Sequence, residues 1–151
     1  MTATAHALVG GVIAATIPDP RLGVTLALAS HPFLDMIPHW DFGRGWKMKT
    51  KLRLFTEASF DLLLGVSLAY LLFGVHVPNI WYFFLCILAS EIWDMLEIPY
   101  WFFNWRFPPF STLYKFQSRI QGRAKDTSFG ILTQVITVSA IVVILNSFTF
   151  Y

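Results

Sequence analysis

The chain has 151 residues, of which 56% are hydrophobic and only 13% are charged. Soluble domains usually carry about 25% charged residues, so this composition excludes an ordinary water-soluble globular protein. The net charge of +2 is too small to indicate a nucleic-acid partner. The length fits one domain that covers residues 1–151, and the single cysteine, Cys86, cannot form an internal disulfide.

The N-terminal third predicts two short apolar helices that form a hairpin. The first covers about residues 3–17 and is ended by the sequence IPDPR, because proline cannot continue a helix. Asp19 is a suitable N-cap for a second helix over about residues 20–36, with Pro20 as its first residue. No Lys or Arg precedes Arg21, so we expect a retained helix and not a signal peptide.

The rest of the chain predicts three long apolar helices, over about residues 51–75, 80–103 and 128–148. Two stretches, Leu62 to Ser90 and Thr127 to Tyr151, contain no Asp, Glu, Lys or Arg. Uncharged apolar runs of roughly 18 residues or more are typical of membrane spans. The predicted fold class is therefore all-α, an integral membrane bundle of about five helices. Residues 111–123 combine apolar and basic residues in a pattern typical of an amphipathic helix on the membrane surface.

Positive residues gather in two segments, and these predict the orientation. One segment precedes and begins the helix at 51–75, and the other lies between the last two long helices; their residues are Arg44, Lys47, Lys49, Lys51 and Arg53, and Arg106, Lys115, Arg119, Arg123 and Lys125. Cytoplasmic loops are enriched in Lys and Arg. We therefore expect an inner-membrane protein in contact with lipid, with both basic segments and the N-terminus on the cytoplasmic side.

Histidines and carboxylates are concentrated in the sequence HPFLDMIPHWDFG at residues 31–43. His31 and Asp35 are four residues apart, which places them on the same face of a helix. His39 and Asp41 follow just beyond Pro38. A hairpin folded about Asp19 brings His6 level with this group.

Further acidic residues are expected at the same depth of the bundle: Glu57, Asp61, Glu91, Asp94 and Glu97. Charged groups inside a membrane are costly and are retained where they pair or serve a function. A divalent metal ion or protons would compensate the carboxylates, and imidazole with carboxylate suits zinc, with manganese as the alternative. Pairing of these acids with basic or aromatic residues would explain them without a metal.

The same residues resemble the membrane-bound metal-dependent hydrolases, the YdjM-like inner-membrane proteins. The opening MTATAHALVGGVIAA is similar to the N-terminal helix of that family, and LDMIPHWD is similar to its LPDID-type motif. The HPFLDMIPH spacing is also similar to zinc sites of phospholipase C and nuclease relatives. The resemblance covers about residues 1–65 and lacks the HRGxTHS segment of many members, with RLFTEASFD in a comparable place.

The resemblance implies a hydrolase of phosphoester or lipid-like substrates. Together with the spacing, it leads us to expect metal ligands at His6, His31, Asp35, His39 and Asp41. Glu57 and Asp61 are the expected catalytic residues, with Glu57 as the general base.

Two other classes of function fit the same residues. Intramembrane carboxylates and histidines also mark the pathways of transported ions or protons. However, the segments around residues 10–25 and 66–85 carry few polar groups, which favours a one-sided site. A small structural subunit that holds a haem or chlorin is the other alternative, with His6, His31 or His76 as axial ligands.

Overall fold

The computed structural model describes residues 1–147, which form six α-helices and contain no β-strand. The helices are α1 (Ala3–Thr16), α2 (Pro20–Asp35), α3 (Lys51–Leu72), α4 (Ile80–Phe102), α5 (Phe110–Ile120) and α6 (Thr127–Ser147). Short 3₁₀ helices precede and follow α3, at Trp46–Met48 and Gly74–His76. The all-α prediction is confirmed: five helices correspond to the predicted apolar segments, and the sixth, α5, corresponds to the predicted amphipathic segment and ends three residues before its predicted end.

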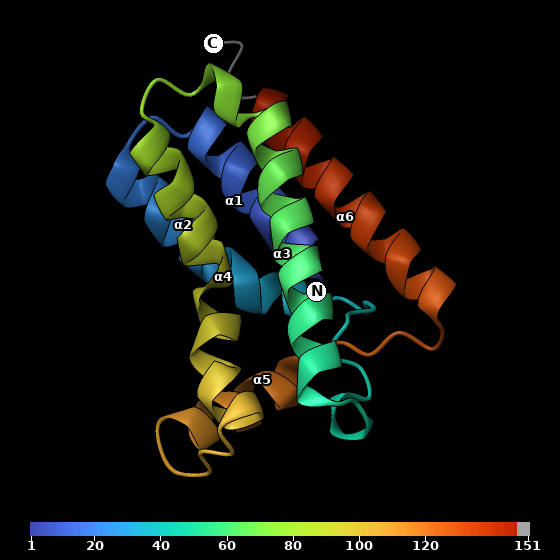
Figure 1. Ribbon diagram of the computed structural model, residues 1–151. Coiled ribbons are helices and arrows are strands. Elements are labelled where there is room, and N and C mark those ends of the chain that lie inside the picture. Colours follow the sequence, from blue (N-terminus) through green and yellow to red (C-terminus); the bar gives the residue numbers. More distant parts are fainter. Residues whose placement is uncertain (148–151) are drawn as a thin grey trace.

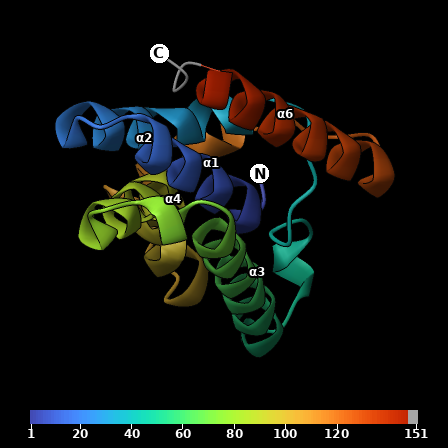
Figure 2. The ribbon, with the colours of Figure 1, turned by 90° about the horizontal axis from the view of Figure 1, so that it is seen from above.

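The N-terminal helix α1 lies at the centre of the bundle, with α2, α3, α4 and α6 packed around it (Figures 1 and 2). Its side chains are small, and Ala7 and Val12 are completely buried. At Gly10 an added Cβ would lie 2.7 Å from Ser90 Oγ, so the glycine permits close contact between α1 and α4. A helix that is apolar on every side is typical of a core position.

The predicted helix ends agree with the structure to within one residue for most helices. Asp19 caps α2, accepting a hydrogen bond of 2.8 Å from the backbone nitrogen of Arg21. α1 and α2 are in contact and joined by a short turn, as expected for the hairpin. α3 ends at Leu72, three residues before the predicted end, because the chain passes into the 3₁₀ helix. The predicted last residue of the final helix, Phe148, lies outside the described residues.

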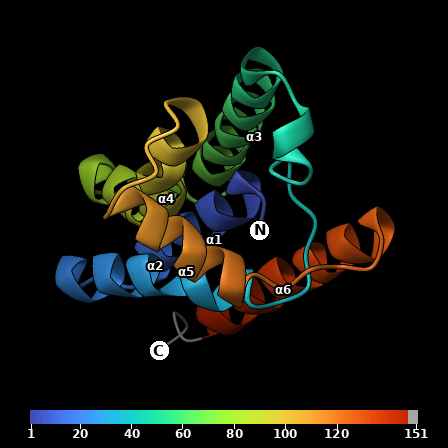
Figure 3. The ribbon, with the colours of Figure 1, turned by 90° about the horizontal axis from the view of Figure 1, so that it is seen from below.

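The amphipathic helix α5 lies across one end of the bundle, beneath α2 and α4 (Figure 3). Its buried residues are polar, Ser111 and Gln117, whereas Phe116 is exposed. The helix therefore turns polar side chains towards the bundle and leaves an aromatic side chain on the outside.

Within residues 1–147, two helices are long and apolar enough to cross a membrane, namely α3 and α6. Large apolar side chains are exposed along both of them, including Leu63 and Leu71 on α3 and Ile136 on α6. α4 is of similar length but carries three carboxylates in its second half, at Glu91, Asp94 and Glu97. Length and composition thus identify two candidate spans, where the sequence predicted three long ones.

Candidate metal centre

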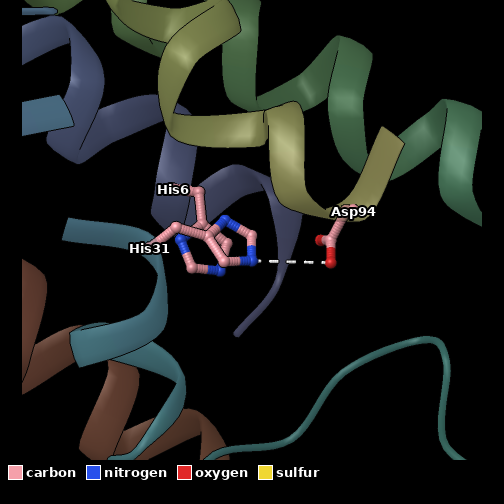
Figure 4. A group of neighbouring side chains, drawn as sticks. All are labelled: His6, His31 and Asp94. Carbon is pink, nitrogen blue, oxygen red and sulfur yellow. Dashed lines mark ion pairs between the residues drawn. The ribbon is translucent and has the colours of Figure 1, made fainter. Parts of the chain in front are cut away.

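Two buried histidines face each other where the start of α1 meets the end of α2 (Figure 4). His6 and His31 are both 0% exposed. Their rings stack with centroids 3.8 Å apart and an angle of 11° between the planes. The hairpin between α1 and α2 brings these residues together, as the sequence predicted.

Asp35 lies at the centre of the polar cluster and contacts three imidazoles. Its Oδ1 atom is 3.2 Å from His6 Nε2 and 3.9 Å from His39 Nε2, and its Oδ2 atom is 3.3 Å from His31 Nε2. The Met1 nitrogen also donates to Oδ1. Asp35 is only 5% exposed, so its negative charge depends on these neighbours for compensation.

Backbone carbonyls fix the orientation of two of the histidines. His31 Nδ1 lies 2.6 Å from the carbonyl oxygen of Ser90, and His39 Nδ1 lies 2.8 Å from that of Ile37. A carbonyl oxygen can only accept a hydrogen bond, so Nδ1 is the protonated nitrogen in both rings. The Nε2 atoms of His31 and His39 consequently face the carboxylates, which is the arrangement common among metal-binding histidines.

Asp94 completes the group from α4. Its Oδ1 atom is 3.5 Å from His31 Nε2, the contact drawn in Figure 4. Donor atoms of His6, His31 and Asp94 all lie within 4.8 Å of one another, close enough for one cation to bind to all three. Asp41 lies beside this group, with Oδ2 3.3 Å from His39 Nε2.

Two glutamines, Gln117 of α5 and Gln121 directly after that helix, complete the polar cluster and were not predicted from the sequence. Gln117 Nε2 lies 3.2 Å from His31 Nε2. Gln121 Nε2 donates to Asp41 Oδ2 at 2.9 Å and lies 3.4 Å from His39 Nε2. The four-residue spacing of these amides, which places them on one face of a helix, is the signal that would have indicated them.

The two predicted catalytic acids have other partners. Asp61 accepts hydrogen bonds from the backbone nitrogens of Ala3 and Thr4 and from the Thr4 hydroxyl, so it holds the first turn of α1. Glu57 is bound by Lys49 on one oxygen and by Arg53 on the other. These contacts favour an anchoring role for Glu57, between α3 and the segment before it, over the predicted role of general base.

A cavity of about 730 Å³ opens beside the cluster. Carboxylates line one part of it, and the exposed cationic side chains of Arg44, Lys47 and Arg123 line another. Its carboxylate residues are Asp35, Asp41, Asp61, Glu91, Asp94 and Glu97, and aromatic residues that share the wall include Phe42, Trp46, Trp101 and Tyr114. Glu57 is not among the lining residues. His39 lines the cavity, whereas His6 and His31 are not among its lining residues. A small organic molecule therefore has room to approach His39 and the carboxylates of the cluster.

Comparisons with protein-family models, with curated proteins and with solved structures find no match to this chain. The resemblance to membrane-bound metal-dependent hydrolases therefore remains an expectation from the sequence. The geometry of the polar cluster and its cavity is the basis for inferring function.

Proposed function

We propose that this protein is a membrane-embedded, metal-dependent hydrolase of phosphoester or lipid-like substrates. The metal ion, zinc or alternatively manganese, is held by His6, His31, Asp35 and Asp94. His39 and Asp41 lie next to this set and complete the polar wall of the site.

The observation that carries the proposal is the orientation of His31 and His39. Their Nδ1 protons are committed to backbone carbonyls, so both Nε2 atoms face carboxylates. In a neutral His31 the Nε2 lone pair would accept from the Gln117 amide, but it would also face the carboxylate oxygens of Asp35 and Asp94, which is unfavourable unless a proton or a cation lies between them. A donor set of imidazole and carboxylate suits zinc and related ions.

The cavity gives the metal site a substrate compartment. A divalent cation held by His6, His31, Asp35 and Asp94 would supply Lewis-acid chemistry to a phosphoester bound in the cavity. Arg44, Lys47 and Arg123 would attract a negatively charged group to the cavity. The aromatic part of the wall offers contact to an apolar portion of the same substrate.

Exposed apolar helices support a location in the membrane. α3 and α6 are the proposed spans, and their large apolar side chains face outward. The cavity is lined by residues of both basic segments, Arg44 and Lys47 from one and Arg123 from the other. By the positive-inside rule, the site lies at the cytoplasmic side of the inner membrane.

Hydrolysis by the purified protein tests this function. We expect the zinc-loaded protein in detergent to cleave bis-(para-nitrophenyl) phosphate or phosphatidylglycerol in mixed micelles. A chelator should abolish the activity and zinc should restore it. His31→Ala should lower the rate by about 100-fold or more, because the imidazole binds the metal directly.

His76→Ala is the matched control, because His76 lies in the 3₁₀ helix after α3 and is not part of the group formed by His6, His31 and Asp94. We expect it to hydrolyse at the wild-type rate. Hydrolysis that survives complete removal of metal would contradict the proposal, and so would a fully metal-loaded, folded protein that cleaves neither substrate.

A further inference from the structure

α4 presents three carboxylates at regular spacing along the wall of the cavity. Glu91, Asp94 and Glu97 follow one another at intervals of three residues, so successive side chains are neighbours on the helix surface. All three line the cavity. Asp94 already contacts His31, whereas Glu91 and Glu97 have no role in the centre described above.

Glu91 and Glu97 are buried without a compensating charge. They are 2% and 3% exposed, respectively. The Oε1 atoms of both residues are buried and lack a hydrogen-bond partner. Within residues 1–147, no Lys or Arg forms an ion pair with Glu91, Asp94 or Glu97. The ion pairs of Lys49 and Arg53 are with Glu57. A buried, ionised carboxylate without a partner destabilises the folded protein unless a cation or a proton neutralises it.

The other carboxylates of the cavity have partners. Asp35 contacts three imidazoles, Asp41 contacts His39 and Gln121, and Asp61 accepts hydrogen bonds at the start of α1. The Met1 ammonium and an ion at the histidines would compensate Asp35 and Asp94. The buried Oε1 atoms of Glu91 and Glu97 would still lack a partner.

We propose that α4 holds a second divalent cation, bound by Glu97 and Asp94, with Glu91 on the preceding turn of the helix. Asp94 is shared between this ion and the ion at the histidines. Its side chain is 42% exposed, so it can be reached from the cavity. The ligands are carboxylate oxygens alone, which favours a hard cation, Mg²⁺ or Mn²⁺, with water in its remaining positions.

A catalytic role for the second ion rests on the proposed hydrolase function. Two metal ions that share a carboxylate can stabilise both the attacking and the leaving oxygen of a phosphoester. The pair thereby favours phosphoester hydrolysis among the substrates of the proposed function. The binding of the ion to α4 does not itself require the histidines.

Titration of the metal-free, full-length protein in detergent with Mn²⁺ alone tests this inference. Electron paramagnetic resonance of free Mn²⁺ gives the number of bound ions. We expect about two ions per chain in the wild type and about one in Glu97→Gln, which keeps the shape of the side chain but removes its charge. The control Asp19→Asn should bind two, because Asn is an equally good N-cap and Asp19 does not line the cavity.

The variant His31→Ala separates this inference from the proposed function. If it retains one ion while Glu97→Gln also retains one, both sites exist. One ion in the wild type that is lost in His31→Ala but kept in Glu97→Gln would overturn the second site and leave the histidine centre intact. One ion that is kept in His31→Ala but lost in Glu97→Gln would support the α4 site and contradict the histidine centre. No bound ion in folded wild type would overturn both.

A spectroscopic signature of the wild type gives a test that needs no variant. Because Asp94 is shared, two bound Mn²⁺ ions should be magnetically coupled, so that the spectrum at two equivalents differs from twice the spectrum at one equivalent. Two bound ions with a simply additive spectrum would overturn the shared carboxylate. Circular dichroism of each variant shows that the helices are retained.

Discussion

Replacing Asp35 with alanine is expected to weaken zinc binding by at least about 100-fold, which corresponds to about 2.7 kcal/mol. The reason is its central position: its two oxygens contact the Nε2 atoms of His6, His31 and His39. The substitution removes a proposed ligand and the only carboxylate that contacts all three imidazoles in the described part of the chain. Isothermal titration of the metal-free protein with zinc measures the effect.

The same titration includes two further variants: Asp35→Asn, which tests the charge of the side chain, and the control Asp19→Asn. Asp35→Asn keeps the size of the side chain and removes its charge, so we expect it to weaken zinc binding as well. Asp19→Asn should bind zinc with wild-type affinity, since Asp19 caps α2 at the opposite end of that helix. Wild-type affinity in folded Asp35→Ala would show that Asp35 is not a ligand.

Replacing Asp61 with alanine is expected to lower the free energy of unfolding by about 2–3 kcal/mol. Asp61 accepts hydrogen bonds of 2.7 and 3.2 Å from the backbone nitrogens of Ala3 and Thr4, and one of 2.7 Å from the Thr4 hydroxyl. These bonds satisfy donors at the start of α1 and place a negative charge at the positive end of its dipole. Chemical unfolding in detergent, followed by circular dichroism, measures the loss.

Ser67→Ala, at an exposed position of the same helix, controls for the substitution itself. It should unfold as the wild type does. Asp61→Asn should be less destabilising than Asp61→Ala, because the amide oxygen still accepts hydrogen bonds. Equal stability of Asp61→Ala and Ser67→Ala would show that the contacts of Asp61 with α1 do not support the fold.

Local sequence signals predicted much of the fold. Pro20 after Asp19 marks the start of α2, and the predicted start of α4 agrees with the structure. The four-residue spacing of His31 and Asp35 correctly placed them on one helix face. The hairpin then brought His6 to the same depth, because its turn is short.

Side-chain contacts between residues far apart in the sequence could not be predicted. Nothing local to Asp61 indicates that it caps a different helix, whose first turn lies 57 or 58 positions away. For Glu57, the ion pair with Arg53, four residues earlier on the same helix, agrees with the alternative that the acidic residues pair with basic ones. The inward face of α5 was also unexpected, since apolar residues suggested lipid contact whereas Gln117 contacts His31.

X-ray absorption at the edge of the bound metal tests the central claim most directly, because it reports the atoms that surround the ion. For zinc-loaded wild type we expect a shell of nitrogen and oxygen with the scattering of at least two imidazoles, from His6 and His31. His31→Ala should lose one imidazole, and His76→Ala should lose none. A zinc shell without imidazole scattering in the wild type, or a folded protein that takes up no zinc, would contradict the account.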